Sequence, residues 1–226
     1  MVGKARIGIT TSLTDGRQSL DTHYAQAVEA AGGIPIIVPL LRSAAAAQSV
    51  AGLLDGLIIS GGPGITRGLI GALPDDLSPV DPLRDTSDEL ALRAMGDRPV
   101  LGICYGMQFV NALAGGAIFG DAQAQATAKA HSPERGAGEH SIQIEANSRL
   151  HDLVGAGQIT TNSDHIQAIA SLGAGLRATA QAEDGVIEAL ESDDGRVVGV
   201  QFHPERMGKR GLPLFTDLVR RARASR

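Results

Sequence analysis

The chain has 226 residues, of which 43% are hydrophobic, enough for one sizeable α/β core, so we expect a single domain spanning 1–226. The net charge is −5 and the basic residues form no large patch, which argues against nucleic acid as a partner. One cysteine excludes an internal disulfide framework, and no leader or apolar span is apparent, so we expect a cytoplasmic protein without a membrane partner.

The first half alternates apolar runs with helical patterns. The runs at 7–10, 34–38, 56–60 and 100–103 predict buried parallel strands. Between them, Asp21 is placed to cap a helix that ends at Gly32, and Thr86 with Glu89 forms a capping-box pattern. Strands alternating with helices predict a doubly wound α/β sheet.

The second half has a different pattern. Alternation at 142–145, followed by runs at 177–180 and 186–190, predicts antiparallel strands added to the sheet. A last buried strand is predicted at 197–202 and a closing helix at 212–224, with Leu214, Phe215 and Leu218 turned inward. The segment 62–85 is rich in Gly, Pro and Asp, and we expect it to overhang the strand ends where ligands bind.

Cys104 lies in the sequence GICYG at 102–106, between an apolar strand and a helical stretch. A lone cysteine is more often a small buried hydrophobe. Here, glycines two residues to either side are typical of a nucleophile elbow, in which a Cβ at those positions would collide with neighbouring backbone. The positive end of the helix dipole favours negative charge on the sulfur. The pattern predicts a cysteine nucleophile.

His203 and Glu205 follow the last predicted strand. A cysteine nucleophile needs a base that takes its proton, and the base needs an acceptor that selects its tautomer. In an extended segment, residues two apart point to the same side, so Glu205 is expected to orient His203. Cys104, His203 and Glu205 are therefore the predicted catalytic triad.

The glycine-rich segment at 60–64 follows another apolar strand. Acyl transfer creates an oxyanion, and backbone N–H groups preorganised around it stabilise it. Gly62 and Tyr105 are the candidate donors. The segment lacks the ending of a phosphate-binding loop and the spacing of a dinucleotide-binding motif.

No cofactor motif is present, and we expect no metal site. The remaining histidines are dispersed in sequence, no His-Glu-x-x-His pattern occurs and there is no second cysteine. These histidines are His23, His131, His140, His151 and His165.

The motifs at 102–108 and 199–205 resemble those of the class I glutamine amidotransferases. The segments 7–10, 24–39, 162–167 and 184–188 resemble the γ-glutamyl hydrolase branch, peptidase C26, which includes γ-glutamyl-γ-aminobutyrate hydrolase. The resemblance implies a flavodoxin-like fold, a small γ-glutamyl substrate and a γ-glutamyl thioester on Cys104. It also implies that Gln108, Asn162, Ser163 and Asp164 hold the glutamyl α-amino and α-carboxylate groups.

Two features resemble a different branch, the glutaminase domain of GMP synthetase: Tyr105 directly after the nucleophile, and the Gly62-Pro63-Gly64 turn. The leading interpretation is a free-standing hydrolase of glutamine or γ-glutamyl amines. The first alternative is a glutaminase subunit that supplies ammonia to a separate synthase partner, and the second is a non-catalytic binding protein of the same fold. The sequence leaves a homo-oligomer open.

Overall fold

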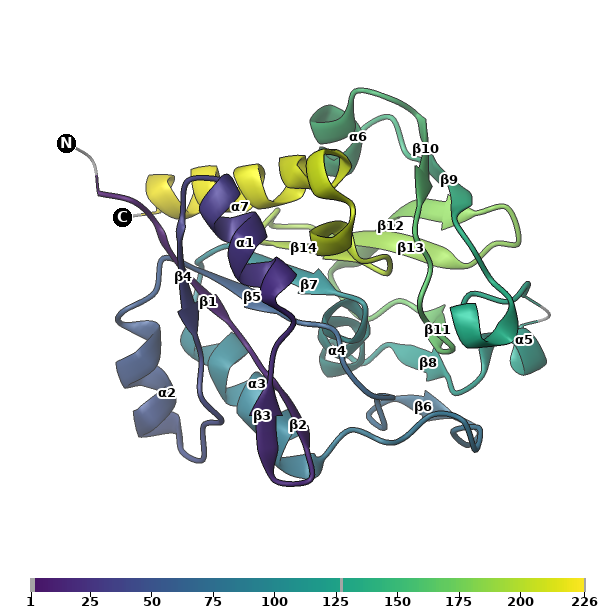
Figure 1. Ribbon diagram of the computed structural model, residues 1–226, viewed down its shortest axis with the longest axis horizontal. Helices are drawn as coiled ribbons and strands as arrows, with labels where there is room; N and C mark the ends of the chain where they lie inside the picture. Colours follow the sequence, from purple (N-terminus) through teal and green to yellow (C-terminus); the bar gives the residue numbers. More distant parts are fainter. Residues whose placement is uncertain (1–2, 127, 226) are drawn as a thin grey trace.

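The computed structural model describes residues 3–126 and 128–225, which are built around a nine-stranded sheet (Figure 1). The strand order is β10-β9-β12-β13-β14-β7-β5-β1-β4. The parallel strands are β1 (Arg6–Ile9), β4 (Ile34–Ile37), β5 (Gly56–Ile59), β7 (Val100–Ile103) and β14 (Val197–Val200). The antiparallel strands are β9 (His140–Ile144), β10 (Gln158–Thr161), β12 (Leu176–Ala182) and β13 (Ile187–Ser192). The predicted α/β sheet with added antiparallel strands is confirmed.

Helices cover both faces of the sheet (Figure 1). Helices α1 (Thr22–Ala30) and α7 (Leu212–Ala224) lie on one face, and α2 (Ala44–Ala51), α3 (Pro82–Ala94) and α4 (Tyr105–Leu113) lie on the other. Successive side chains of β5 enter different cores: Ile58 packs with the α1 and α7 side, and Leu57 and Ile59 with the other. This alternation is the two-residue period of a strand buried on both faces.

Helix starts follow their capping residues. Asp21 accepts a hydrogen bond from the His23 N–H, as predicted, and the chain leaves α1 through Gly32 at φ +81°. Helix α2 is an alanine-rich segment that the sequence analysis did not predict, and Ser43 caps it by accepting from the Ala46 N–H. Both caps satisfy an N–H that has no carbonyl partner within its helix.

The predicted capping box of Thr86 and Glu89 is wrong. Helix α3 begins at Pro82, where Asp81 caps it by accepting from the Leu83 N–H. A proline is favoured at this first position because its missing N–H would have had no helical partner. Thr86 lies inside the helix, where its hydroxyl donates to the Pro82 carbonyl.

Small elements surround the carboxyl ends of the parallel strands. They are the hairpin β2 (Ser12–Thr14) and β3 (Arg17–Ser19), and the three-stranded sheet of β6 (Leu69–Ile70), β8 (Ala117–Phe119) and β11 (Ala168–Ser171). Helix α5 (Ala122–Gln125) follows β8, and helix α6 (Arg149–Val154) packs against α7. The segment 62–85 contains β6 and the start of α3. Five of its residues line a cavity of about 710 Å³: Gly62, Pro63, Gly64, Asp76 and Leu77.

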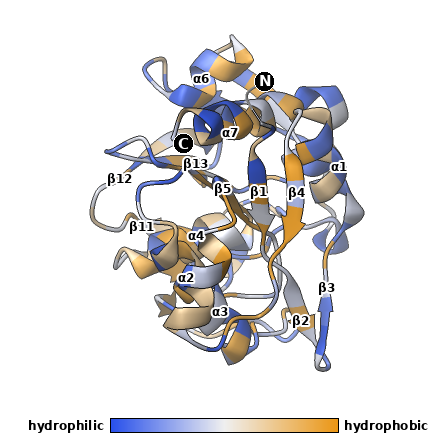
Figure 2. Ribbon diagram, turned by 90° about the vertical axis from the view of Figure 1, so that its left-hand side faces the viewer, coloured by the Kyte–Doolittle hydropathy of each residue, from blue (hydrophilic) through white to orange (hydrophobic). Residues whose placement is uncertain are grey.

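The sheet has one apolar edge. Figure 2 shows β4 coloured as hydrophobic beside β1, and β4 is the last strand in the order of the sheet. Ile34 and Ile37 on this edge are 40% and 51% exposed. Across residues 3–126 and 128–225, none of the helices combines the length and apolarity needed for a bilayer span.

Candidate active site

Cys104 lies at a sharp turn between β7 and α4, with φ 51° and ψ −107°. This conformation is strained for a residue with a side chain. The two flanking glycines are needed because a Cβ on Gly102 would lie 2.7 Å from the Gly106 carbonyl oxygen, and a Cβ on Gly106 would overlap with the carbonyl oxygen of Ile59 in β5. The strand–turn–helix arrangement expected of a nucleophile elbow is therefore present.

His203 directs one ring nitrogen at Glu205 and interacts with the Cys104 sulfur. Strand β14, which precedes His203, pairs in parallel with β7, so both residues emerge from neighbouring strand ends. His203 Nδ1 lies 2.6 Å from Glu205 Oε1, and both side chains are buried. Because a carboxylate only accepts, Nδ1 donates. The expected contact forms, although the segment is not extended: Pro204–Arg206 is a 3₁₀ turn.

The electrostatics of His203 favour its protonated form. Burial opposes a charge on the ring, but the negative sulfur of Cys104 and the carboxylate of Glu205 outweigh burial and raise the pKa of His203 to about 10. The ring therefore holds its proton at neutral pH. A protonated imidazole stabilises a neighbouring thiolate and can later donate to a leaving nitrogen.

The glycine-rich segment is held in one orientation by Arg84. The Arg84 guanidinium donates to the carbonyls of Ser60 and Gly61, each at 3.0 Å, and the Gly61 N–H donates to the Tyr24 hydroxyl at 2.9 Å. In a trans peptide the N–H points opposite to the carbonyl, so the Gly62 N–H points away from Arg84. A Cβ on Gly62 would overlap with Arg84 Nη1, which explains the glycine.

Arg84 was not predicted from the sequence to take part in the site. Its side chain is fully buried, forms an ion pair with Asp88 at 3.3 Å and stacks on the Tyr105 ring at 4.2 Å. Burial raises the pKa of Asp88 to about 6, although the Arg84 charge opposes the rise. An arginine four residues before an aspartate on a helix is usually a surface pair, so the spacing gave no sign of burial.

A cavity of about 710 Å³ opens over Cys104 and His203. Gly62 and Gln108 line it, and most of its charged residues are acidic. The acidic side chains are those of Asp21, Asp76, Glu134 and Asp164, and the one arginine among the lining residues is Arg206. Arg206 donates to Asp164 at 2.8 Å, so part of its charge is already balanced.

Gln108 and Asp164, two of the four residues expected to hold substrate, line this cavity. The amide nitrogen of Gln108 contacts the Gln167 carbonyl at 3.1 Å and Gln201 Oε1 at 3.0 Å, so both of its hydrogens are used. The Gln108 oxygen is the atom left to meet a ligand. The backbone carbonyl of Asp164 lies 3.9 Å from the Cys104 sulfur.

Asn162 and Ser163, the other two, have different partners in the structure. The Asn162 side chain accepts from the His203 N–H and donates to the His203 carbonyl, both at 2.9 Å. The Ser163 hydroxyl donates to the His131 carbonyl at 2.7 Å. Neither residue is among those that line the cavity. Asn162 therefore fixes the backbone of His203.

The fold and the relatives of the chain are consistent with the class I glutamine amidotransferase-like superfamily. A family model for peptidase C26 matches residues 5–205, and the chain belongs to this family. The protein is therefore a hydrolase that acts on amide bonds.

Named relatives agree with this assignment, and a solved structure has a similar fold. The chain is 31% identical to a Schizosaccharomyces pombe protein provisionally named as a glutamine amidotransferase, PB2B2.05, over 94% of this chain and 86% of that one. It is 28% identical to γ-glutamyl-γ-aminobutyrate hydrolase PuuD of Escherichia coli K12, over 83% and 79% of the two chains. Its fold is similar to that of a Thermoplasma acidophilum protein provisionally described as a GMP synthase subunit, with a TM-score of 0.71, 18% identity and coverage of 98% and 96%.

Proposed function

We propose that the protein hydrolyses the γ-glutamyl amide bond of glutamine or of γ-glutamyl amines through a γ-glutamyl thioester on Cys104. The observation that carries the proposal is the position of Cys104. It lies on a strained turn at the floor of a cavity, beside a buried histidine whose other nitrogen is bound to a buried glutamate. This is the arrangement of nucleophile, base and orienting acceptor that covalent acyl transfer requires.

In the first half-reaction, the Cys104 sulfur attacks the γ-carbonyl carbon of the substrate and a C–S bond forms. The carbonyl oxygen becomes an oxyanion, for which the Gly62 and Tyr105 N–H groups are the proposed donors. Tyr105 is the first residue of α4, so its N–H has no helical carbonyl behind it. His203 then donates its proton to the nitrogen, the C–N bond breaks, and ammonia or an amine leaves.

In the second half-reaction, water attacks the thioester carbonyl. His203, now neutral, accepts a proton from the water, while Glu205 keeps the ring oriented. The C–S bond breaks, the sulfur leaves as a thiolate and glutamate is released. The protonated histidine and the thiolate are thereby restored.

The acidic lining of the cavity suits a substrate that carries ammonium groups. A γ-glutamyl compound presents an α-ammonium and an α-carboxylate. Asp76 is already paired with Arg135, at 2.9 and 2.8 Å, so Glu134 is the proposed partner of positive charge. Arg206 is the proposed partner of the carboxylate. Because the four acidic side chains that line the cavity outnumber Arg206 and Arg135 together, we expect γ-glutamyl amines with a cationic leaving group to bind more tightly than those with an anionic one.

The test is release of glutamate from glutamine and from a panel of γ-glutamyl amines by the purified protein alone. We expect turnover of at least one amide, and loss of turnover in Cys104→Ala and His203→Ala. His151→Ala is the matched control, because His151 lies on α6 outside the cavity. Folded wild-type protein that hydrolyses none of the amides would contradict the proposal.

The second candidate is a glutaminase subunit, favoured by Tyr105 and by the turn at 62–64. It predicts slow glutamine hydrolysis that rises when a synthase partner is added, with no γ-glutamyl amine as a substrate. A non-catalytic binding protein is separated from both by labelling. A γ-glutamyl chloroketone should alkylate Cys104 rapidly in the wild type and slowly in His203→Ala, and equal slow labelling would favour the binding protein.

A further inference from the structure

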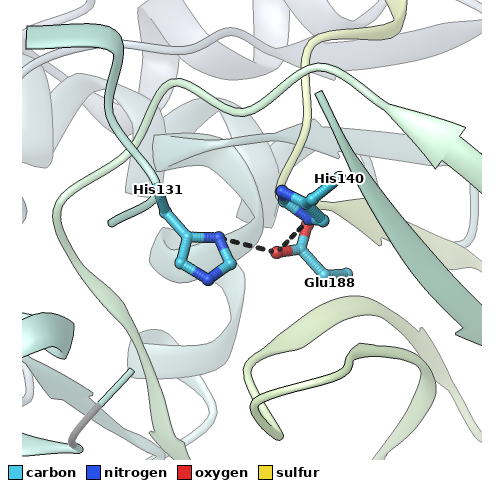
Figure 3. A group of neighbouring side chains, drawn as sticks. All are labelled: His131, His140 and Glu188. Atoms are coloured by element: carbon cyan, nitrogen blue, oxygen red, sulfur yellow. Dashed lines mark ion pairs between the residues drawn. The ribbon is translucent and has the colours of Figure 1, made fainter. Parts of the chain in front are cut away.

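Three histidines that are far apart in sequence meet around one buried glutamate. Glu188 lies on β13 with its side chain fully buried. His131 precedes a short 3₁₀ turn (Pro133–Arg135), His140 opens β9, and His165 lies between β10 and β11. Figure 3 shows His131 and His140 on either side of the Glu188 carboxylate.

The contacts converge on a single oxygen. Glu188 Oε1 lies 3.4 Å from His131 Nδ1, 3.2 Å from His140 Nε2 and 3.4 Å from His165 Nε2. Among the described residues, neither oxygen of Glu188 has a hydrogen-bond partner, and the facing nitrogens of His140 and His165 have none either. Buried polar atoms without partners are costly, so this group needs an explanation.

The outer hydrogen bonds determine where the ring protons are. His131 Nε2 lies 2.9 Å from Asp184 Oδ2, and His165 Nδ1 lies 2.9 Å from the Gln167 carbonyl. Both partners only accept, so these nitrogens carry the protons. In the neutral tautomers, the inner nitrogens of His131 and His165 therefore direct lone pairs at the Glu188 carboxylate.

The hydroxyl of Ser163 does not supply the missing proton. Ser163 Oγ lies 3.3 Å from His131 Nδ1, but its one proton is donated to the His131 carbonyl at 2.7 Å. Imidazole lone pairs and a carboxylate that face one another in a buried space repel unless a cation lies between them. The cluster thus has the electrostatics of a cation site.

We propose that His131 Nδ1, His140 Nε2 and Glu188 Oε1 bind a divalent transition metal, with zinc the best match to the donor set. These three atoms lie within 4.8 Å of one another. Around a tetrahedral zinc with bonds of about 2.0–2.1 Å, neighbouring ligand atoms are about 3.4 Å apart. The measured separations from Glu188 Oε1, 3.4 and 3.2 Å, are close to that spacing.

The surroundings support the proposal. Metal-binding histidines usually donate their second nitrogen to a carboxylate, and Asp184 provides that carboxylate for His131. A surface hollow of about 430 Å³, lined by His131, His140 and Asp184, offers a route from solvent. His165 Nε2 faces the same oxygen, but His165 is not one of the three residues whose ligand atoms lie close to one another. We therefore do not include His165 among the ligands.

The dispersed histidines gave no indication of a metal site in the sequence, whereas the fold brings three of them together. The bound ion would tie β9 and β13 to the segment before the 3₁₀ turn. It would also border the segment 163–165, whose Asp164 carbonyl approaches Cys104. We assign the ion a structural role in holding these segments.

The experiment uses the full chain as Cys104→Ala, because a thiolate beside His203 is itself a zinc-binding pair. The protein is stripped with a chelator, dialysed and titrated with Zn²⁺ against a chromophoric competitor, and bound metal is counted by mass spectrometry. We expect one zinc per chain and a melting temperature several degrees higher with zinc. We also expect visible absorption bands from Co²⁺ bound in its place.

Variants locate the site. His140→Gln, whose side chain is partly exposed, should weaken zinc binding by roughly 100-fold or more, and Asp184→Asn by roughly 10- to 100-fold. His23→Gln and His151→Gln are matched controls and should bind as the parent does. Circular dichroism of the metal-free variants checks their folding. The proposal would be overturned if the folded parent bound no stoichiometric zinc, or if both His140→Gln and Asp184→Asn bound zinc as the parent does. The cluster would then hold a proton shared between the histidines and Glu188 instead of a metal ion.

Discussion

Replacing Arg84 tests how the glycine-rich segment is held. In Arg84→Met, Asp88 loses its partner inside the protein, and breaking a buried ion pair in this way costs about 3–5 kcal/mol. The carbonyls of Ser60 and Gly61 lose their donor as well. The Gly61–Gly62 peptide is then free to turn, and a misplaced oxyanion donor lowers kcat by roughly 100- to 1,000-fold.

The stability loss should depend on pH in a defined direction. The pKa of Asp88 is already raised to about 6 by burial, against about 3.9 for an unfolded aspartate. The folded protein therefore favours the protonated form of Asp88. The stability that this preference contributes is fully present below pH 3.9 or so and is lost as pH rises through about 6. Without the Arg84 charge, the pKa rises further. The destabilisation of Arg84→Met should thus be smaller at pH 5 than at pH 8.

A double variant separates folding from positioning. Arg84→Met with Asp88→Leu replaces the buried pair by apolar side chains, which is often tolerated, so most of the stability should return. The lost kcat should not return, because the two carbonyls still lack their donor. Urea unfolding and steady-state kinetics measure the two effects, and Arg93→Met on the same helix is an exposed control with a change below about 1 kcal/mol. Wild-type kcat in the folded double variant would refute the positioning role of Arg84.

Three further predictions concern the nucleophile and its base. Glu205→Gln should lower kcat by roughly 100-fold or more. It should also move the alkaline limb of the kcat/KM profile below pH 10 or so, because one of the groups that raise the pKa of His203 is gone. An alkaline limb that does not move would count against this role of Glu205. Gly106→Ala should reduce the free energy of unfolding by about 1–3 kcal/mol or more, because the new Cβ overlaps with the Ile59 carbonyl. Gly138 has open space around it, so Gly138→Ala should leave the melting temperature nearly unchanged. Asn162→Ala should lower kcat by up to roughly 100-fold, because the His203 backbone loses both of its hydrogen bonds to Asn162. Asn147→Ala, at an exposed position, is the control and should leave kcat unchanged. Equal kcat values for the two variants would show that Asn162 does not position His203.

The elements that carry the triad were predictable because their signals are local. Apolar runs marked the strands of the parallel half, and the glycines at 102 and 106 marked a turn at which a Cβ is excluded. The contact between His203 and Glu205 was expected for the wrong reason. The residues meet through a 3₁₀ turn imposed at Pro204, which periodicity in an extended strand does not describe.

By itself, the sequence indicated the main parallel strands, the position of Cys104 at a strand end and the family to which the chain belongs. Only the tertiary structure decided which distant side chains share a partner. Arg84 binds the carbonyl of Gly61 in the glycine-rich segment, and Asn162 binds the backbone of His203. His131 and His140 lie beside Glu188. The reason is physical: a backbone turn is set by residues adjacent in sequence, whereas a buried charge or hydrogen bond is set by whatever the packed sheet brings within a few ångströms.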